Sequence, residues 1–233
     1  MASPKLVLYN NRLCPYAARA VVALDETKAA HEVIEINLSE PRPDWYLKDI
    51  NPYGQVPSLK VNDSDVILES LFVSEYVSDL HPEANLLPSD PLLRAKVRNL
   101  IYHWDARVQP AHRKATFTLD PKEAAAYHET LIVELGKFNN LLLNVPNKES
   151  NAAGPFYLGE QFSLAEVAIG PHLVRFFLVE QYNGNKLPTV KSNPELAKFF
   201  NWKDAVLERA SIKKVSPPQD ELVQVYKKWL VQA

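Results

Sequence analysis

The 233-residue chain has only one cysteine and six glycines, and it has no long hydrophobic run. A single cysteine excludes an internal disulfide, which suits a reducing compartment. No stretch approaches the roughly 18 apolar residues that a membrane-spanning helix needs. The first residues also lack the charged and then apolar segments of a secretory signal, so we expect a cytoplasmic protein without a membrane span.

Several kinds of chemistry are also excluded by what is missing. The six histidines show no pair at metal-ligand spacing, and one cysteine adds little, so no metal site is expected. The few glycines form no phosphate-binding loop, and no Gly-x-Ser-x-Gly nucleophile motif occurs. The formal net charge of −2 lacks the basic excess of a nucleic-acid-binding protein, so we expect no nucleic-acid partner.

What is present is an ordinary globular composition whose first third alternates strand and helix patterns. Strands are predicted at residues 5–9, 31–37, 58–61 and 66–68, and helices at residues 15–28, 45–50 and 70–80. A strand–helix–strand crossover requires a parallel pair, and two strands joined by the polar turn at 62–65 add an antiparallel pair. The sequence therefore predicts an α/β domain with a four-stranded mixed sheet of the thioredoxin-like type.

A proline-rich segment divides the chain after this domain. It carries three prolines and no periodicity, which predicts a first domain at residues 1–81, a linker at 82–91 and a second domain at 92–233. The second domain reads as all-helical, with a polar loop at 146–155. Helices are predicted at residues 92–117 with a kink at Pro110, and at 121–145, 164–182, 193–210 and 217–232. Ser163 and Glu166 form a capping box at the start of the third of these.

The single cysteine, Cys14, lies between the first strand and the first helix, with Pro15 in the first helical position. Unpaired N–H groups and the helix dipole at such a position favour the thiolate. We therefore expect the pKa of Cys14 to fall below about 8.5, which makes it a catalytic nucleophile. The alternative is a small buried hydrophobic residue without chemistry.

Four features in this order resemble the cytosolic glutathione transferases, and most of all their omega class. They are the Cys-Pro-Tyr-Ala motif at 14–17 with Arg19, the segment Asn-Pro-Tyr-Gly-Gln-Val-Pro-Ser-Leu at 51–59, the Glu69-Ser70 pair, and the helical part with its capping box. The resemblance covers nearly the whole chain. It implies a glutathione-binding first domain, a second domain that contributes a hydrophobic substrate pocket, and a homodimer.

The resemblance also implies a set of glutathione-binding residues beside Cys14. Pro57 is expected to follow a cis peptide bond, which would leave the backbone of Val56 free to pair with the cysteinyl part of glutathione. Glu69 and Ser70 would hold the γ-glutamyl group. Arg42 occupies a loop where omega-class proteins commonly carry a lysine that reaches the glycyl carboxylate, although this loop is one residue longer. The alternatives stay open: a plain turn proline, a helix cap and a solvated arginine.

Ala17 stands where a dithiol oxidoreductase carries its second cysteine, so a disulfide at Cys14 needs an external thiol, which points to glutathione as co-substrate. We expect glutathione-dependent thiol transfer and deglutathionylation through a mixed disulfide at Cys14, with dehydroascorbate reduction as a side activity typical of the family. The alternative is a non-catalytic binder of hydrophobic or phenolic small molecules. The hydrophobic pocket is predicted to include Leu13, Pro15, Tyr16, Tyr127, Arg175, Phe176 and Trp229.

Overall fold

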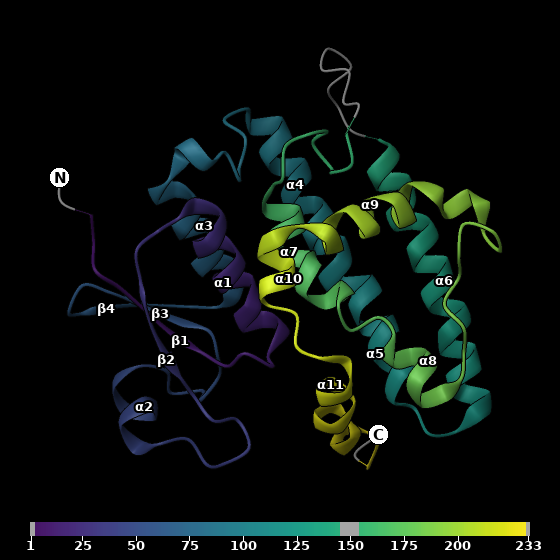
Figure 1. Cartoon of the computed structure of the whole chain (residues 1–233), viewed down its shortest axis with the longest axis horizontal. Coiled ribbons are helices and arrows are strands. Elements are labelled where there is room, and N and C mark those ends of the chain that lie inside the picture. The colour runs from purple at the N-terminus through teal and green to yellow at the C-terminus, as the bar shows by residue number, and fades with distance from the viewer. Residues whose placement is uncertain (1–2, 145–153, 232–233) are drawn as a thin grey trace.

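A four-stranded mixed sheet forms the N-terminal part of the computed structural model, which describes residues 3–144 and 154–231 (Figure 1). The strands are β1 (Leu6–Asn10), β2 (Glu32–Glu35), β3 (Ser58–Val61) and β4 (Asp65–Leu68), in the order β2-β1-β3-β4. The β1–β2 pair is parallel, and the β1–β3 and β3–β4 pairs are antiparallel. This topology confirms the predicted α/β fold.

Side chains of β1 point alternately to two apolar layers, as the pleat of a strand requires. Leu6 and Leu8 belong to the large core that includes α1 (Pro15–Thr27) and α3 (Ser70–Leu80). Val7 and Tyr9 belong to a smaller core with Tyr46 of α2 (Asp44–Asp49). Because both faces of β1 are covered, its end is fixed firmly, and this is the end that carries Cys14.

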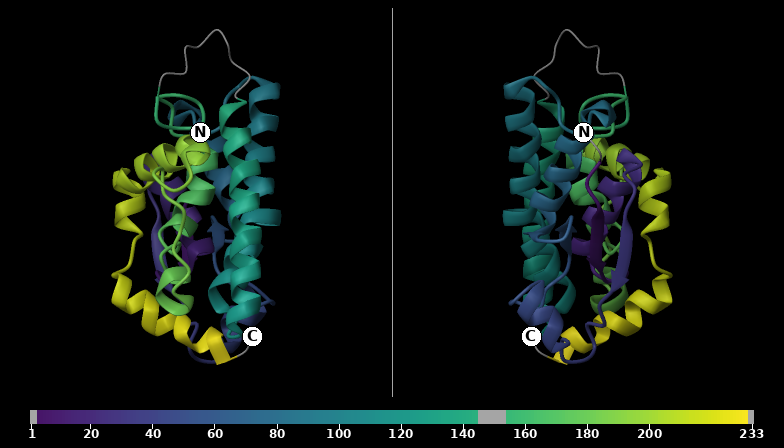
Figure 2. Two further views of the ribbon diagram at one scale, coloured as in Figure 1. Left: turned by 90° about the vertical axis from the view of Figure 1, so that its right-hand side faces the viewer. Right: turned by 90° about the vertical axis from the view of Figure 1, so that its left-hand side faces the viewer.

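The remaining described chain is helical. Its α-helices are α4 (Pro91–His103), α5 (Gln109–Phe117), α6 (Pro121–Leu143), α7 (Leu164–Leu173), α8 (Leu178–Asn183), α9 (Ala197–Glu208), α10 (Ala210–Lys214) and α11 (Gln219–Tyr226). Short 3-10 helices occupy Pro82–Ala84, Pro194–Leu196 and Lys227–Val231. Figure 2 shows the long blue and teal helices on one side of the molecule and the yellow C-terminal segment on the other. None of the described helices is long and apolar enough to cross a membrane.

Two predicted helices are interrupted. The helix expected at 92–117 is interrupted by a π-helical segment at Trp104–Val108. This segment ends two residues before Pro110, whose missing N–H weakens the regular hydrogen-bond ladder. The helix expected at 164–182 is likewise two helices, α7 and α8, separated by turns. Val145, most of the polar loop at 146–155 and Gln232 lie outside the described residues.

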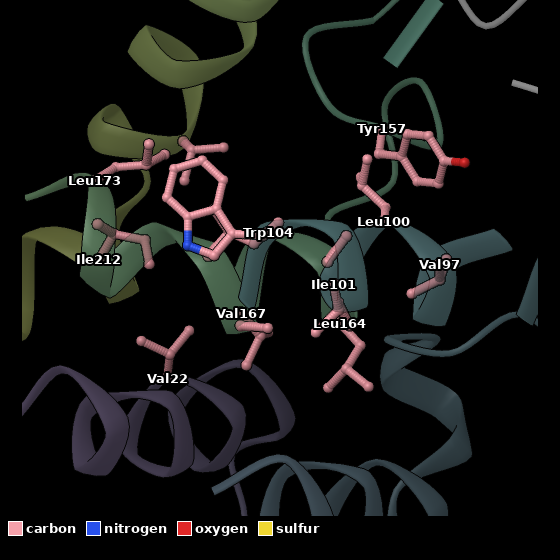
Figure 3. Close-up of a cluster of buried hydrophobic side chains, with 14 of the residues drawn as sticks. Val22, Val97, Leu100, Ile101, Trp104, Tyr157, Leu164, Val167, Leu173 and Ile212 are labelled. Carbon is pink, nitrogen blue, oxygen red and sulfur yellow. The ribbon is translucent and has the colours of Figure 1, made fainter. Parts of the chain in front are cut away.

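Helix α7 is the centre of the junction between the sheet part and the helical part. All ten of its residues are buried, and the predicted capping box of Ser163 and Glu166 begins it. Figure 3 shows Val22 of α1, Val167 of α7 and Ile101 of α4 pointing into one apolar cluster. The proline-rich segment joins this core, because Leu86 is buried and its carbonyl accepts a hydrogen bond from Leu164 N. The two parts therefore pack through a shared core.

Candidate active site

The loop that carries Cys14 is held by the side chain of Asn11. The Asn11 amide donates to the carbonyl of Ile36, and its oxygen accepts from Leu13 N. Cys14 N donates to the Asn11 carbonyl at 3.0 Å, and Cys14 then serves as the N-cap of α1 with extended backbone. These contacts fix the thiol at the point where β1 ends and α1 begins.

The Cys14 thiol is half-buried, and its sulfur lies 3.9 Å from the carbonyl oxygen of Val56. Burial raises the pKa of the Cys14 thiol above its ordinary value. Backbone N–H groups in the first turn of α1 and the guanidinium groups of Arg175 and Arg19 act in the opposite direction but have less effect. The predicted lowering of this pKa is therefore wrong for the unliganded protein, because the helix-terminus argument omits the loss of hydration.

Four of the residues assigned to glutathione on the sheet side lie beside Cys14. The Val56–Pro57 peptide bond is cis, as the resemblance implies. Ser70 is the first residue of α3, and Glu69, its N-cap, has φ 67, a conformation that is uncommon for a residue with a side chain. Together with Cys14, these residues line a cavity of about 840 Å³.

Arg42 also lines this cavity, but its guanidinium is mostly occupied within its own loop. Nε donates to the carbonyl of Gly54 at 3.0 Å, and Nη2 donates to the carbonyl of Leu38 at 3.2 Å. Nη1 donates to the carbonyls of Asn37 and Glu40. Four of the five guanidinium N–H groups are thus used, and one remains for a ligand.

Arg19 links the sheet side of the cavity to the helical part, a role that the sequence motif does not reveal. Its side chain is buried, and Nε donates to the carbonyl of Ala168 in α7 at 2.7 Å. Nη1 lies 3.5 Å from the Ser70 hydroxyl, and both terminal nitrogens donate to Asp105 in the π-helical segment. The buried cation therefore has a carboxylate partner and fixes Ser70 against the helical part.

Most of the predicted pocket residues line the cavity. Leu13, Pro15 and Tyr16 come from the cysteine loop and the first turn of α1, and Arg175, Phe176 and Trp229 come from the helical part. Tyr127 is not among the cavity-lining residues, since its ring on α6 faces the ammonium group of Lys114 at 5.2 Å. The structure thus brings six of the seven predicted pocket residues together.

Two buried histidines line the cavity without having been predicted. His112 stacks on the ring of Phe176 with 4.4 Å between centroids, and burial lowers its pKa to about 4. His172 meets Tyr16 edge-on at 5.0 Å, and burial, Arg19 and Arg175 lower its pKa well below the ordinary value. Both imidazoles are therefore neutral near pH 7. The sequence shows these two residues only as histidines within apolar helical segments, and a histidine in such a segment usually belongs to the hydrophobic core.

The C-terminal helix α11 lies at the lower end of the molecule in Figure 1 and contributes to the cavity wall. Arg175 connects it to the cysteine loop: Nε donates to the Tyr226 hydroxyl at 2.9 Å, and Nη2 donates to the Leu13 carbonyl at 2.8 Å. Arg12 of the same loop forms a two-point ion pair with Glu221. Helix α11 is therefore fastened directly to the loop that presents the thiol.

No arrangement that would hold a metal ion is found in the described part of the chain. Within residues 3–144 and 154–231, histidine, cysteine, aspartate and glutamate side chains form no group of three or more with metal-binding geometry. The described wall of the cavity offers a thiol, cationic side chains and hydrogen-bonding groups.

Comparison with known proteins identifies relatives of one family. A family model described as the glutathione S-transferase N-terminal domain matches residues 8–85. A probable glutathione transferase omega-2 of Caenorhabditis briggsae is 30% identical over 211 residues, which cover 88% of this chain and 79% of that relative. The solved structure of glutathione transferase Omega 3C from Trametes versicolor has a TM-score of 0.82 at 25% identity, covering 99% of this chain and 92% of that one. Omega 2S from the same organism, solved in complex with 2,4-dihydroxybenzophenone, has a TM-score of 0.76 at 26% identity, covering 97% and 100%.

Proposed function

Because this chain belongs to the glutathione transferase family of enzymes and is omega-like, we propose that it transfers thiol groups with glutathione through Cys14. The observation that carries the proposal is the placement of the only cysteine in the wall of the cavity, beside Val56, Glu69 and Ser70. A hydroxyl at this position would hold the sulfur of glutathione by hydrogen bonding, whereas a thiol can bond to it covalently.

Enzymes of this family use glutathione as a substrate, and the sheet side of the cavity fits its charged groups. The Ser70 hydroxyl and the N-terminus of α3 suit the γ-glutamyl carboxylate. The Glu69 carboxylate suits the ammonium of the same residue. The free N–H of Arg42 suits the glycyl carboxylate. In this proposal residues 1–81 bind glutathione, and residues 92–233 contribute the second substrate pocket.

The proposed reaction has two thiol–disulfide exchanges. The Cys14 thiolate attacks the glutathione sulfur of a mixed disulfide, the sulfur–sulfur bond breaks, and the other thiol leaves as a thiolate that takes up a proton. A second glutathione, as its thiolate, then attacks the Cys14–glutathione disulfide and releases oxidised glutathione and free Cys14. One disulfide is reduced and one is formed, so electrons and protons balance.

A glutathione thioether of the phenacyl type would react at the same sulfur. There the Cys14 thiolate would break the carbon–sulfur bond, and the departing carbon would leave as an enolate that takes up a proton. The Cys14–glutathione disulfide and its release by a second glutathione are common to both substrates. Dehydroascorbate reduction, a further proposed activity, would draw its electrons from the same pair of glutathione molecules.

Mass spectrometry of the intact protein tests the central step. Because Cys14 is the only cysteine, one glutathione added after incubation with oxidised glutathione must be bound at this residue. We expect one adduct in the wild type, none in Cys14→Ser, and loss of activity toward hydroxyethyl disulfide in the same variant. Circular dichroism is the control for folding of Cys14→Ser. Full disulfide reductase activity in this variant would refute the proposal.

Binding of phenolic or other hydrophobic molecules without catalysis is the second proposal, and the size of the cavity favours it. A volume of about 840 Å³ exceeds what glutathione alone requires, and pockets of this size bind drug-sized ligands. The relative solved with 2,4-dihydroxybenzophenone adds to this support. Equilibrium binding of that compound should then be unchanged in Cys14→Ser. Negligible turnover by the wild type together with such binding would favour the binding role.

We also propose that the protein forms a homodimer through α3 and α4. Ion pairs Asp79–Arg94 and Glu75–Arg98 show that these helices run antiparallel, side by side. Phe72 and Tyr102 lie about one helical turn further along α3 and α4 from the Glu75–Arg98 pair, and these residues are 66% and 69% exposed. Exposed aromatic pairs of this kind mark association surfaces. Light scattering should give twice the chain mass, and the variant carrying Phe72→Ser and Tyr102→Ser should give the mass of one chain.

A further inference from the structure

The helical side of the cavity carries positive charge without a matching acid. Four cationic residues line the whole cavity, namely Arg42, Arg113, Arg175 and Lys228, whereas Glu69 is the one acidic residue in its described wall. Glu69 and Arg42 lie on the sheet side, where the proposed function assigns them to the two ends of glutathione. The other three cations remain on the side of the second substrate.

Arg175 is the most informative of these cations, because it is buried and has no carboxylate partner among the described residues. Its side chain donates to a tyrosine hydroxyl and to the carbonyls of Pro171 and Leu13, which uses three of its five N–H groups. Arg19 makes the contrast clear: it is equally buried, but its charge is matched by Asp105. Buried arginines are rarely left without a counter-charge. The Cys14 thiol feels the charge of Arg175 but is not ionised in the resting protein, so Arg175 can accept an anion from outside the chain.

A second polar group beside Arg175 also lacks a partner. His172 is 5% exposed and lines the cavity, and its Nε2 atom has no hydrogen-bond partner in the described structure. A neutral imidazole can donate one hydrogen bond from Nε2. The rings of Tyr16 and Phe176 line the same region, with Trp104 buried in the core behind them, and Arg113 lies over the ring of Trp229 at 4.9 Å. Aromatic rings therefore lie near the unused N–H groups of Arg175 and near His172.

We infer that the helical side of the cavity binds an aromatic carboxylate, so that the preferred substrates are glutathione disulfides or conjugates whose leaving group carries this acid. The aromatic ring would lie between the aromatic walls. Its carboxylate would accept hydrogen bonds from the two unused N–H groups of Arg175 and from His172, and Arg113 would attract it at the entrance. This inference rests on the proposed function for turnover but not for binding.

A matched pair of substrates tests the inference: the mixed disulfides of glutathione with 4-mercaptobenzoate and with 4-mercaptobenzamide. The amide has nearly the same shape and is the better leaving thiol, because a neutral carbonyl withdraws more electron density than a carboxylate. Any preference for the acid must therefore come from binding. We expect kcat/KM for the acid to exceed that for the amide about tenfold, the effect of one hydrogen bond to a charged group.

The variants are judged by the ratio of the two kcat/KM values. Arg175→Gln is expected to bring the ratio to one or below, and any disturbance of the Leu13 loop will lower both rates alike and leave the ratio unaffected. Lys114→Gln, which removes a charge next to Arg113 but outside the cavity wall, should keep the wild-type ratio. A wild-type ratio of one or below, or a ratio unchanged in Arg175→Gln, would overturn the inference.

A binding measurement separates this inference from the proposed function. The unreactive thioethers 4-(methylthio)benzoate and 4-(methylthio)benzamide are titrated into Cys14→Ser with glutathione present, and quenching of tryptophan fluorescence is recorded. We expect the acid to bind about tenfold more tightly. If Cys14→Ser shows this preference but the wild-type protein fails to reduce hydroxyethyl disulfide, thiol transfer alone is refuted. Equal affinities would refute the anion site alone.

Discussion

Replacement of His112 by phenylalanine is expected to make the protein more resistant to acid. The imidazole is buried and stacked on Phe176 with an angle of 2° between the rings, so a phenyl ring fits the same space. Burial lowers the pKa of His112 from 6.5 to about 4. Its Nε2 makes only long contacts, 3.4 Å to the Phe176 carbonyl and 3.4 Å to the Thr116 hydroxyl. The Thr116 hydroxyl also donates to the His112 carbonyl, so the substitution leaves it satisfied.

The sign of this effect on stability follows from the protonation of residue 112 in the folded and in the unfolded state. Below pH 6.5 the unfolded chain protonates His112 while the folded protein keeps it neutral, so the unfolded state binds more protons and the free energy of unfolding decreases as the pH is lowered. The loss is about 2 kcal/mol at pH 5, and it approaches about 3 kcal/mol once the pH is below both pKa values. At pH 7 and above, this contribution to stability is fully present.

Urea denaturation at pH 7 and pH 5, followed by tryptophan fluorescence, measures this quantity. Wild-type protein should lose about 2 kcal/mol more between these values than His112→Phe, because the other titrating groups, His172 included, are common to both proteins. His31→Gln, at an exposed position, is the control and should behave as wild type. Equal losses in wild type and His112→Phe would refute the reasoning.

Three further predictions concern the core and the site. Glu166→Ala should destabilise the protein by about 3 kcal/mol or more, because the buried carboxylate accepts from Trp202 Nε1 and from two backbone N–H groups that would lose their acceptor; the denaturation midpoint measures this. Alkylation of Cys14 by iodoacetamide should accelerate continuously from pH 7 to beyond about 8.5, since burial raises its pKa, and a plateau below pH 7 would contradict this. Glu69→Gln should raise KM for glutathione about tenfold with little change in kcat, whereas the exposed Glu83→Gln should change neither.

The topology of the sheet part could be predicted because local sequence patterns reveal the order of its strands and helices. The strand patterns, the predicted four-residue turn and the proline-rich segment can each be recognised within a few residues of sequence. Together with the rules for strand connections, they favour one sheet topology. The breaks in the helical part were not predictable in this way. The π-helical segment presents Asp105 to Arg19 of α1, and the interruption after α7 allows Arg175 to reach Leu13. Such contacts are tertiary and leave no periodicity in the sequence.

The candidate site shows the same difference between local patterns, which the sequence reveals, and tertiary contacts, which it does not. The residues that the sequence analysis assigns to glutathione lie at the end of β1 and the start of α1, before β3 and at the start of α3. The topology brings these points to one edge of the sheet, so element order suffices to predict that the residues lie together. The pKa of Cys14 fails as a sequence prediction because it depends on how much of the thiol the fold covers.

The helical side depends on which side chains meet across 51 to 162 residues of sequence, the separations of Arg175 from Tyr226 and from Leu13. Arg19 and Arg175 are the same amino acid and both are buried, Arg19 in α1 and Arg175 in the turn after α7, the helix that packs on α1. Nothing in their local sequence separates the two. The fold gives Arg19 an aspartate from 86 residues away and gives Arg175 only neutral acceptors, one of them 162 residues away. The first arginine is therefore a structural link, and the second has donors to spare for a ligand. The ratio of acid to amide turnover would change with Arg175, whereas the replacement of Arg19 would remove stability from the junction itself.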